Sequence, residues 1–304
     1  MRFDIIIPCY NKKPDIVLRC FKSIREAYDQ YQGLLLLDLH VLIIDDASTE
    51  YSDELRESAI EALGGSGIEW RYSKNPKNLG CFLSRISGTH KALFGEDIVG
   101  GWLVHLDPDD TLLPNFFNAL IPFIESKSSK YLSCIPIEAE VYSVKGDYWD
   151  NDDQSYMKDF DSLRAVAEAG NTVWNSVCDK IWNSQFFYSA IVSPIISKYT
   201  LLKPSLEHIN YMEDFLFSMI YMQFECQMAY FPIRIERAYM DEEGSSCNDT
   251  ELGDDAKQKI RDCMNHIRKA IESLIDAETL KIDTLTAVRY TRQMDRLITD
   301  YKLQ

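Results

Sequence analysis

Short apolar runs alternate with longer segments of helical periodicity along the first 125 residues. Residues 4–7, 39–44 and 102–106 are such runs, and each is ended by proline or by aspartates. Apolar runs of this length, often rich in β-branched residues, are typical of strands buried on both faces of a sheet. We therefore predict parallel strands at these three places and a further strand at residues 70–72.

Between the runs, apolar side chains recur three or four positions apart, as they do on one face of a helix. The pattern predicts helices over residues 14–31, 52–63 and 82–94. The predicted buried face of the second helix consists of Leu55, Ala59, Ile60 and Leu63. Later in the chain the pattern predicts strand and loop over 131–150, helices over 161–169 and 213–223, and two amphipathic helices over 256–304.

The alternation of strands with helices predicts βαβ units, and therefore an α/β fold with a mostly parallel sheet. Ligands in such folds bind at the carboxyl ends of the strands. Polar clusters occur at those ends, at residues 10–11, 45–46 and 107–110. This repetition predicts a binding site along one edge of the sheet.

The composition is globular, because 46% of the 304 residues are hydrophobic and 26% are charged. The formal charge is −16, from 32 Lys and Arg against 48 Asp and Glu. This charge balance argues against nucleic acid as a partner and against electrostatic binding to an anionic membrane. Residues 147–161 carry a net charge of −5 and residues 241–255 a net charge of −7, so the acidity is concentrated in two predicted loops.

No segment approaches the ~18–20 apolar residues that span a bilayer, so we expect no transmembrane segment. The N-terminal apolar run is too short for a signal peptide, so we expect a cytoplasmic protein. A solvated helix face is the main interpretation of the basic residues near the C-terminus, and peripheral membrane contact is the alternative. Eight cysteines without a CxxC pair and five histidines without an HExxH pattern argue against a zinc site.

Asp107, Asp109 and Asp110 follow the predicted strand at 102–106 directly. Carboxylates this close repel one another unless a cation joins them. Oxygen ligands of this kind suit Mg²⁺ or Mn²⁺, with diphosphate oxygens completing the coordination shell. The alternative is an Asp-rich turn that caps a helix.

Three further positions have two interpretations each from the residues alone. Asp46, or its neighbour Asp45, can accept a hydrogen bond from a nucleobase or a ribose, or can cap the helix that begins near residue 52. Arg85 can contact a base or a phosphate from its helix, or can be a surface arginine. Asp214 lies in an apolar segment, where a carboxylate either caps a helix or acts as a general base.

The ordered set of segments resembles family 2 glycosyltransferases of the GT-A fold. The segments are IIPCYN, VLIIDDAST, NLG with SR, LDPDD followed by LLP, CDKIW and MEDFLF. The resemblance covers about residues 3–125 closely and 175–245 more loosely. It implies a Rossmann-like sandwich with a nucleotide-sugar-binding half at 1–125, an acceptor-binding half at 126–250 and a helical extension at 251–304.

The resemblance also implies a role for each matching residue. Asp109 corresponds to the metal ligand, Asp107 faces the ribose or the sugar, and Asp214 corresponds to the general base. Lys180 lies in a segment that family members place near acceptor and sugar, although the preceding Cys178 and Asp179 depart from the family's pattern. The remaining implied donor-binding residues are Pro8, Tyr10, Asp46 and Arg85.

The implied activity is inverting, dependent on Mn²⁺ or Mg²⁺, and uses a nucleotide-diphosphate sugar, with a UDP-sugar as the commonest donor. By analogy with bacterial family members, the acceptor is a hydroxyl of a glycan or lipid-linked glycan in surface polysaccharide synthesis. A non-catalytic nucleotide-sugar-binding protein on the same fold is the alternative. A nucleotidyltransferase ranks last, because the loop after the first strand contains no glycine.

Overall fold

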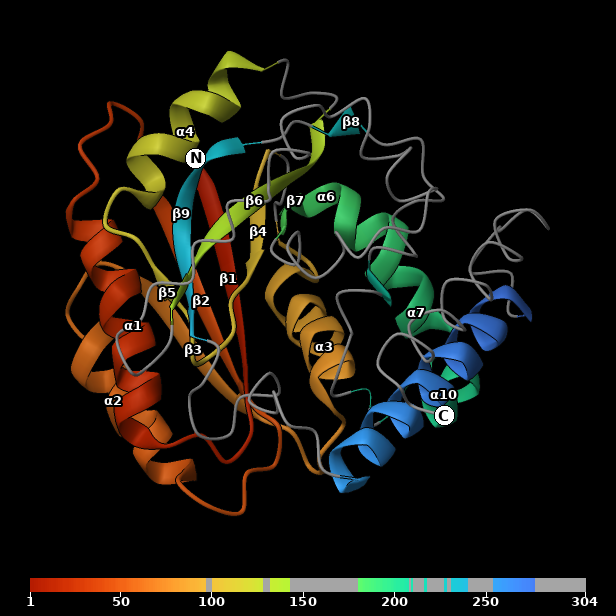
Figure 1. Cartoon of the computed structure of the whole chain (residues 1–304). Helices are drawn as coiled ribbons and strands as arrows, with labels where there is room; N and C mark the ends of the chain where they lie inside the picture. Colours follow the sequence, from red (N-terminus) through yellow and green to blue (C-terminus); the bar gives the residue numbers. More distant parts are fainter. Residues whose placement is uncertain are drawn as a thin grey trace.

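A mostly parallel sheet forms the centre of the protein, seen here in a computed structural model (Figure 1). The structure describes residues 1–96, 100–127, 132–142, 180–207, 209, 216–217, 227–228, 231–239 and 254–276. The first strands and helices are β1 (Arg2–Cys9), α1 (Pro14–Asp29), β2 (Asp38–Asp45), α2 (Ser52–Leu63), β3 (Glu69–Lys74), α3 (Cys81–Leu93), β4 (Trp102–His105), β5 (Thr111–Leu112) and α4 (Phe116–Ser126). The later ones are β6 (Leu132–Tyr142), β7 (Lys180–Asn183), α6 (Ser184–Phe187), the π-helix η3 (Tyr188–Val192), α7 (Ser193–Ser197), α8 (Tyr199–Leu206), β8 (Gln227–Met228), β9 (Phe231–Tyr239) and α10 (Asp254–Asp276).

The strand order in the described part of the chain is β3-β2-β1-β4-β7-β6-β9-β5, with β8 beside β6. Strands β3, β2, β1 and β4 are parallel, whereas β7 runs antiparallel to both β4 and β6. Strand β5, which follows the acidic turn after β4, pairs with the late strand β9. The two halves expected at 1–125 and 126–250 therefore share one continuous sheet.

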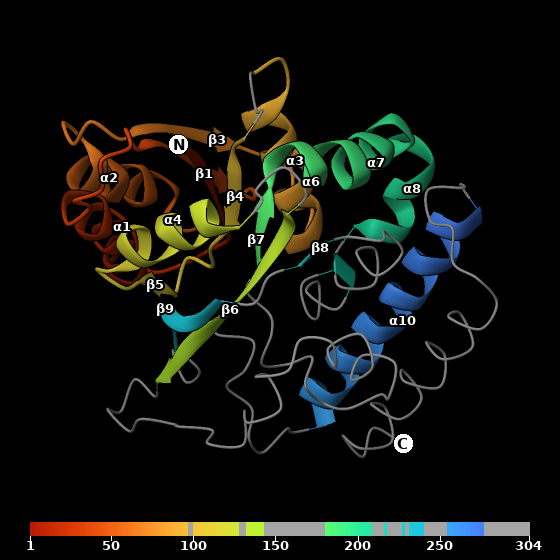
Figure 2. The same ribbon diagram turned by 90° about the horizontal axis from the view of Figure 1, so that it is seen from above.

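Helices cover both faces of the sheet (Figure 2). Alternating side chains of β1 and β2 separate the two cores: Ile5 and Ile7 pack with α1, α2 and α4, whereas Ile6 and Ile44 pack with α3, α6–α8 and α10. Burial on both faces explains why these strands appear as continuous apolar runs in the sequence. Helix α3 lies close to the sheet, since a Cβ at Gly88 would come within 2.9 Å of both Ile6 and Ile44.

The structure confirms the α/β class and the four strands and three helices predicted from the first 125 residues. One position of the predicted core is wrong: the side chain of Ile60 is 53% exposed, because it lies at the solvent side of α2 while Ala59 beside it is buried. Helix α10 confirms the first helix predicted after residue 256. The helix predicted over 161–169 and the second C-terminal helix lie outside the described residues.

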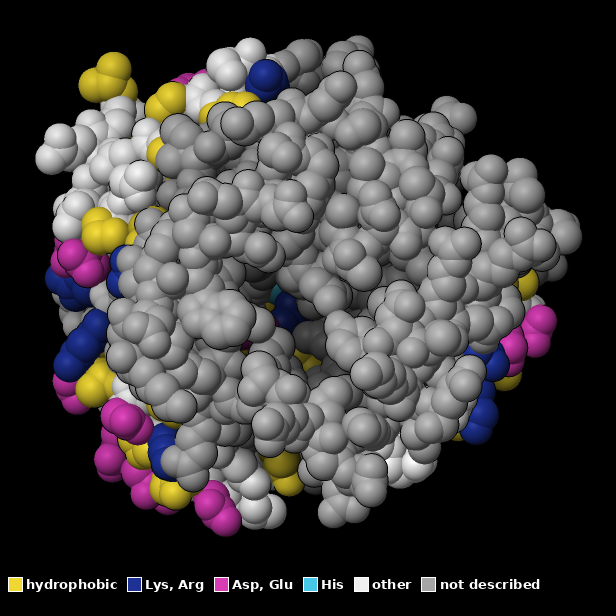
Figure 3. Space-filling view, in the orientation of Figure 1, with side chains coloured by type: hydrophobic (Ala, Val, Ile, Leu, Met, Phe, Trp, Pro, Cys, Tyr) yellow, Lys and Arg dark blue, Asp and Glu magenta, His cyan; other side chains and the backbone are white. Residues whose placement is uncertain are grey.

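The surface of α1 and α2 carries both signs of charge (Figure 3). Exposed ion pairs there include Lys22 with Glu61 at 2.7 Å and Arg25 with Asp29 at 2.5 Å.

None of the helices in the described part of the chain combines the length and apolar character that crossing a bilayer requires. The acidic segments at 147–161 and 241–255 lie outside the described residues, apart from the first backbone positions of α10.

Candidate active site

The polar clusters singled out in the sequence meet at the carboxyl edge of the parallel strands. Strand β1 lies between β2 and β4 and pairs Cys9 with Asp45 and Ile6 with His105. The loops that follow these three strands are therefore neighbours, although their residues are separated by up to about a hundred positions. This arrangement confirms the expectation that these clusters share one edge of the sheet.

Asp45 is fully buried and holds the turn that leads into α2. Its Oδ1 accepts from the backbone N–H of Ser48 at 2.7 Å, and its Oδ2 accepts from the hydroxyls of Ser52 at 2.5 Å and Tyr72 at 2.6 Å. Burial acts to raise the pKa of Asp45, but these hydrogen bonds outweigh it and lower the pKa below its usual range. Asp45 therefore has a structural role, since it holds the turn at the carboxyl edge of the sheet.

Replacing Asp45 by asparagine should destabilise the protein by about 2–3 kcal/mol at neutral pH, because an amide cannot accept all three hydrogen bonds. A carboxylate whose pKa is lower in the folded than in the unfolded protein stabilises the fold at pH values above the pKa that it has in the unfolded chain. This contribution is lost as the pH falls through the pKa that it has in the folded protein. The penalty of Asp45→Asn should therefore be constant above about pH 5 and shrink below about pH 4. Urea unfolding of both proteins at several pH values measures it.

Asp29→Asn is the matched control for this experiment, since it makes the same chemical change at a carboxylate that is paired with Arg25 on the surface. Its side chain is 49% exposed, so the loss should be below about 1 kcal/mol at every pH. A penalty for Asp45→Asn that persists unchanged to pH 3 would contradict the role of the ionised carboxylate.

The carboxylate of Asp46, 3% exposed, organises the turn that precedes α3. Its Oδ1 accepts from Asn75 Nδ2 at 2.8 Å and from the backbone N–H of Leu79 at 2.9 Å, and its Oδ2 accepts from the N–H of Gly80 at 2.9 Å. The backbone of Gly80 has φ +87°, in the left-handed region that glycine tolerates best. Asp46 thus sets the start of α3, and its expected contact with a nucleoside stays a prediction.

Arg85 projects from α3 toward the acidic turn after β4. Its side chain is 6% exposed, so the alternative of a surface arginine is wrong. The guanidinium Nη2 donates to Oδ1 of Asp107 at 2.5 Å. Asp107 is 42% exposed and therefore remains accessible to a ligand while its charge is balanced by Arg85.

Asp109 forms an ion pair with Lys12, which lies in the loop between β1 and α1. The Lys12 Nζ donates to Oδ2 of Asp109 at 2.6 Å, and the two side chains are 16% and 12% exposed. Burial and the nearby Asp107 raise the pKa of Asp109, an effect that Lys12 opposes. Burial acts to lower the pKa of Lys12, but the interaction with Asp109 outweighs it and raises that pKa.

The backbone around this ion pair is tied to its neighbours. The Asn11 Oδ1 accepts from the N–H groups of Thr49 and Glu50 at 2.9 and 3.1 Å, which joins the loop after β1 to the loop after β2. Arg19 of α1 donates from Nη2 to the carbonyl of Asp109 at 2.7 Å. The positions of both Lys12 and the acidic turn are thereby fixed by contacts outside the ion pair.

Sequence reasoning placed Asn11 in a polar cluster at this edge but missed Lys12 and Arg19. A signal existed for Lys12, which directly follows a strand end that was expected to carry ligands. No comparable signal existed for Arg19, because its partner is a backbone carbonyl 90 positions away.

Two other positions from the resemblance lie on the same strand end as Lys12. Pro8 is buried in β1 beside Ile44, and Tyr10 is 46% exposed just after the strand. An exposed aromatic ring at this edge offers a surface on which a base can stack, and this role remains a prediction for Tyr10. Lys180 opens β7, where only its backbone is described, and Asp214 lies outside the described residues.

His105 and Cys9 lie beside the acidic turn but inside the protein. Burial and the nearby Arg85 lower the pKa of His105 well below its ordinary value, which leaves the ring neutral at neutral pH. Its Nε2 lies 3.2 Å from the hydroxyl of Thr89. Burial raises the pKa of the Cys9 thiol, so this cysteine is not an activated nucleophile.

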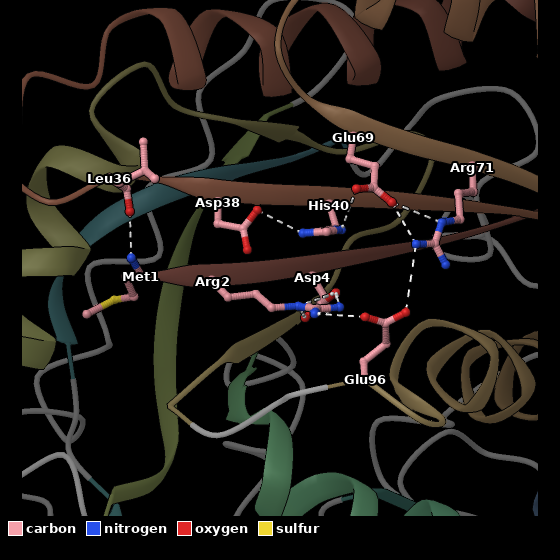
Figure 4. A network of polar contacts seen from close by, with 9 residues as sticks. All are labelled: Met1, Arg2, Asp4, Leu36, Asp38, His40, Glu69, Arg71 and Glu96. Carbon is pink, nitrogen blue, oxygen red and sulfur yellow. Dashed lines mark hydrogen bonds and ion pairs between the residues drawn. The ribbon is translucent and has the colours of Figure 1, made fainter.

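A second charged cluster lies at the opposite, amino edge of β1–β3 (Figure 4). Arg2 donates to the buried Asp4 at 2.9 Å and lies 3.5 Å from Glu96, while His40 lies 2.9 Å from Asp38. Glu69 accepts from Arg71 at 2.6 Å. Arg2 and Arg71 offset part of the negative charge of the four acids across three strands, and we assign the cluster a structural role.

Comparisons with known proteins bear on the family and the fold of the chain. The family model described as "Glycosyl transferase family 2" matches residues 4–177, more than half of the chain. A comparison with curated protein sequences gave no match.

Two solved structures illustrate the likeness of fold. The crystal structure of S. aureus TarS residues 1–349 is 14% identical with a TM-score of 0.50, over 96% of this chain and 79% of that one. GalNAc-T7, solved with UDP, GalNAc and Mn²⁺, is 15% identical with a TM-score of 0.53, over 88% of this chain and 48% of that one. The chain thus spans about half the length of GalNAc-T7, and this likeness concerns the fold.

Proposed function

Since the chain belongs to glycosyl transferase family 2, we propose that it transfers a sugar from a nucleotide-diphosphate sugar to a hydroxyl of a glycan or glycoconjugate. One observation carries the proposal: Asp107 and Asp109 follow one strand end and face two cations of the chain, Arg85 and Lys12, at the ligand-binding edge of the sheet. Two carboxylates beside two cations fit a metal ion together with a diphosphate.

The donor set suits Mg²⁺ or Mn²⁺, because it consists of hard carboxylate oxygens. Among the described residues, no group of three or more His, Cys, Asp and Glu side chains could hold a metal ion. Such ions are commonly held by one or two carboxylates, with water and substrate phosphates completing the shell. Asp109 would hold the metal ion, which neutralises the charge of the departing diphosphate when bound.

The residues of the chain then have distinct roles. Arg85 orients Asp107 toward the donor. Tyr10 and the turn held by Asp46 contact one face of the base. Asp214 accepts the proton of the acceptor hydroxyl, whose oxygen attacks the anomeric carbon from the face opposite the diphosphate. The carbon–oxygen bond to the diphosphate breaks as the new glycosidic bond forms, so configuration inverts in one displacement.

The donor is proposed as a UDP-sugar, on the strength of the family resemblance and of UDP in the GalNAc-T7 structure. The acceptor is proposed as a surface polysaccharide or its lipid-linked precursor, on the resemblance alone. The acidic segments at 147–161 and 241–255 disfavour a polyanionic acceptor.

A thermal-shift screen of UDP, GDP and dTDP, each with and without Mn²⁺, tests the donor part of the proposal. A ligand that binds only the native state raises its stability, by about 2.7 kcal/mol at a hundred times its dissociation constant. We expect one diphosphate to raise the melting temperature by several degrees only when Mn²⁺ is present. Absence of any shift would contradict the proposal, and binding without transfer or donor hydrolysis would favour the non-catalytic alternative.

A further inference from the structure

The cation that the proposed function places on Asp109 has a competitor within the chain. The ammonium of Lys12 lies 2.6 Å from Oδ2 of Asp109, and both side chains are largely buried. A divalent ion coordinated by the same oxygen would lie at about 2.1 Å from it. The two cations therefore cannot share this oxygen without strong repulsion.

A metal ion that arrives alone and takes this oxygen has to break the ion pair. It then leaves Lys12 partly buried beside a second cation, which is unfavourable. A metal ion that arrives with a diphosphate brings anionic oxygens that can accept the ammonium in place of Asp109. The cost of displacing Lys12 is thus offset only when both ligands are present.

The loop after β1 suits such an exchange. The backbone beside Lys12 is held by the hydrogen bonds of Asn11 to Thr49 and Glu50, so the start of the side chain stays in place. The four-carbon stem of lysine is flexible and its charge has no fixed orientation, unlike the planar fork of arginine. The ammonium can therefore move between neighbouring anions without a change of fold.

We propose that Lys12 couples metal binding to donor binding. It pairs with Asp109 in the donor-free protein and passes to the diphosphate when the metal ion takes its place. The inference rests on the proposed function, and it adds that the metal ion and the nucleotide bind cooperatively because of this one side chain. Cooperativity of this kind is reciprocal, so each ligand raises the affinity of the other by the same factor.

Calorimetric titration of Mn²⁺ into the protein, alone and with the diphosphate selected by the thermal-shift screen, tests this coupling at fixed pH and ionic strength. In Lys12→Met, Mn²⁺ alone should bind several-fold more tightly than in the wild type. The factor by which the nucleotide raises Mn²⁺ affinity should fall about tenfold, within the usual range of coupling energies. Lys12→Gln, which also lacks the charge, should behave alike, and circular dichroism checks that both variants are folded.

Lys22→Met is the matched control, because it removes a lysine from an ion pair with Glu61 on the exposed surface of α1 and α2. It should leave both the Mn²⁺ affinity and the coupling factor unchanged. A folded Lys12→Met or Lys12→Gln protein with wild-type coupling would overturn the inference while leaving the proposed function intact. A wild type that binds no diphosphate even with Mn²⁺ would overturn the proposed function, and the inference with it.

Discussion

Asp109→Asn should lower the rate of sugar transfer by at least about a thousandfold and remove the Mn²⁺-dependent part of donor binding. A metal ion that stabilises a departing diphosphate contributes several kcal/mol to the transition state, and each 1.36 kcal/mol is about tenfold in rate. The amide has almost the shape of the carboxylate but lacks its charge. Steady-state kinetics and nucleotide titrations with and without Mn²⁺ measure the two effects separately.

Asp110→Asn is the control for this variant, since it makes the same chemical change at the next residue. The Asp110 Oδ1 accepts a hydrogen bond from the backbone N–H of Tyr239 at 3.2 Å, and the oxygen of an asparagine can do the same. We expect near wild-type turnover from it. An Asp109→Asn protein that turns over at the wild-type rate would show that Asp109 is not the metal ligand.

Asp214→Asn should reduce transfer by about 10²–10⁴-fold, the usual contribution of a general base, while donor affinity stays unchanged. The residue lies outside the described part of the chain, and the expectation rests on the MEDFLF segment. Transfer rates and nucleotide affinity, measured on the same preparation, give both quantities.

Glu213→Gln serves as the neighbouring control, because it neutralises a carboxylate one residue away. We expect a smaller loss of transfer than at Asp214. A loss of donor binding in Asp214→Asn would instead place this carboxylate at the diphosphate, and equal losses in both variants would remove the distinction between base and neighbour.

Much of the fold could be predicted because its central strands are buried on both faces. Residues 39–44 are an example, since a mostly apolar run ended by two aspartates fits a buried parallel strand. The two-residue strand β5 could not be found, because its existence depends on pairing with β9, more than a hundred residues later. Ile60 shows the limit of periodicity, since one position of error on a helix moves a side chain from the core to solvent.

The sequence predicted that the candidate site lies at the carboxyl edge of the sheet, but it did not predict the contacts between the side chains there. The sequence does not reveal which of the adjacent Asp45 and Asp46 supports which loop, whereas the structure assigns the first to the turn before α2 and the second to the turn before α3. The sequence indicated the acidic turn and singled out Arg85, but it did not indicate Lys12. Lys12 and Asp109 are 97 positions apart, and only the parallel order of β1 and β4 brings them together.

The hydrogen bond from Tyr239 to Asp110 spans 129 positions, and the Arg19 guanidinium lies 3.9 Å from the centre of the Tyr239 ring. The acidic turn is thus completed by the last described strand of the sheet. At a synthesis rate of about 5–20 residues per second, roughly 6–26 seconds separate the two partners on the ribosome. During that interval β5 has no partner strand, and the nascent chain exposes an incomplete sheet edge. Chaperones should therefore bind nascent chains truncated near residue 125 more strongly than nascent chains long enough for β9 to have emerged.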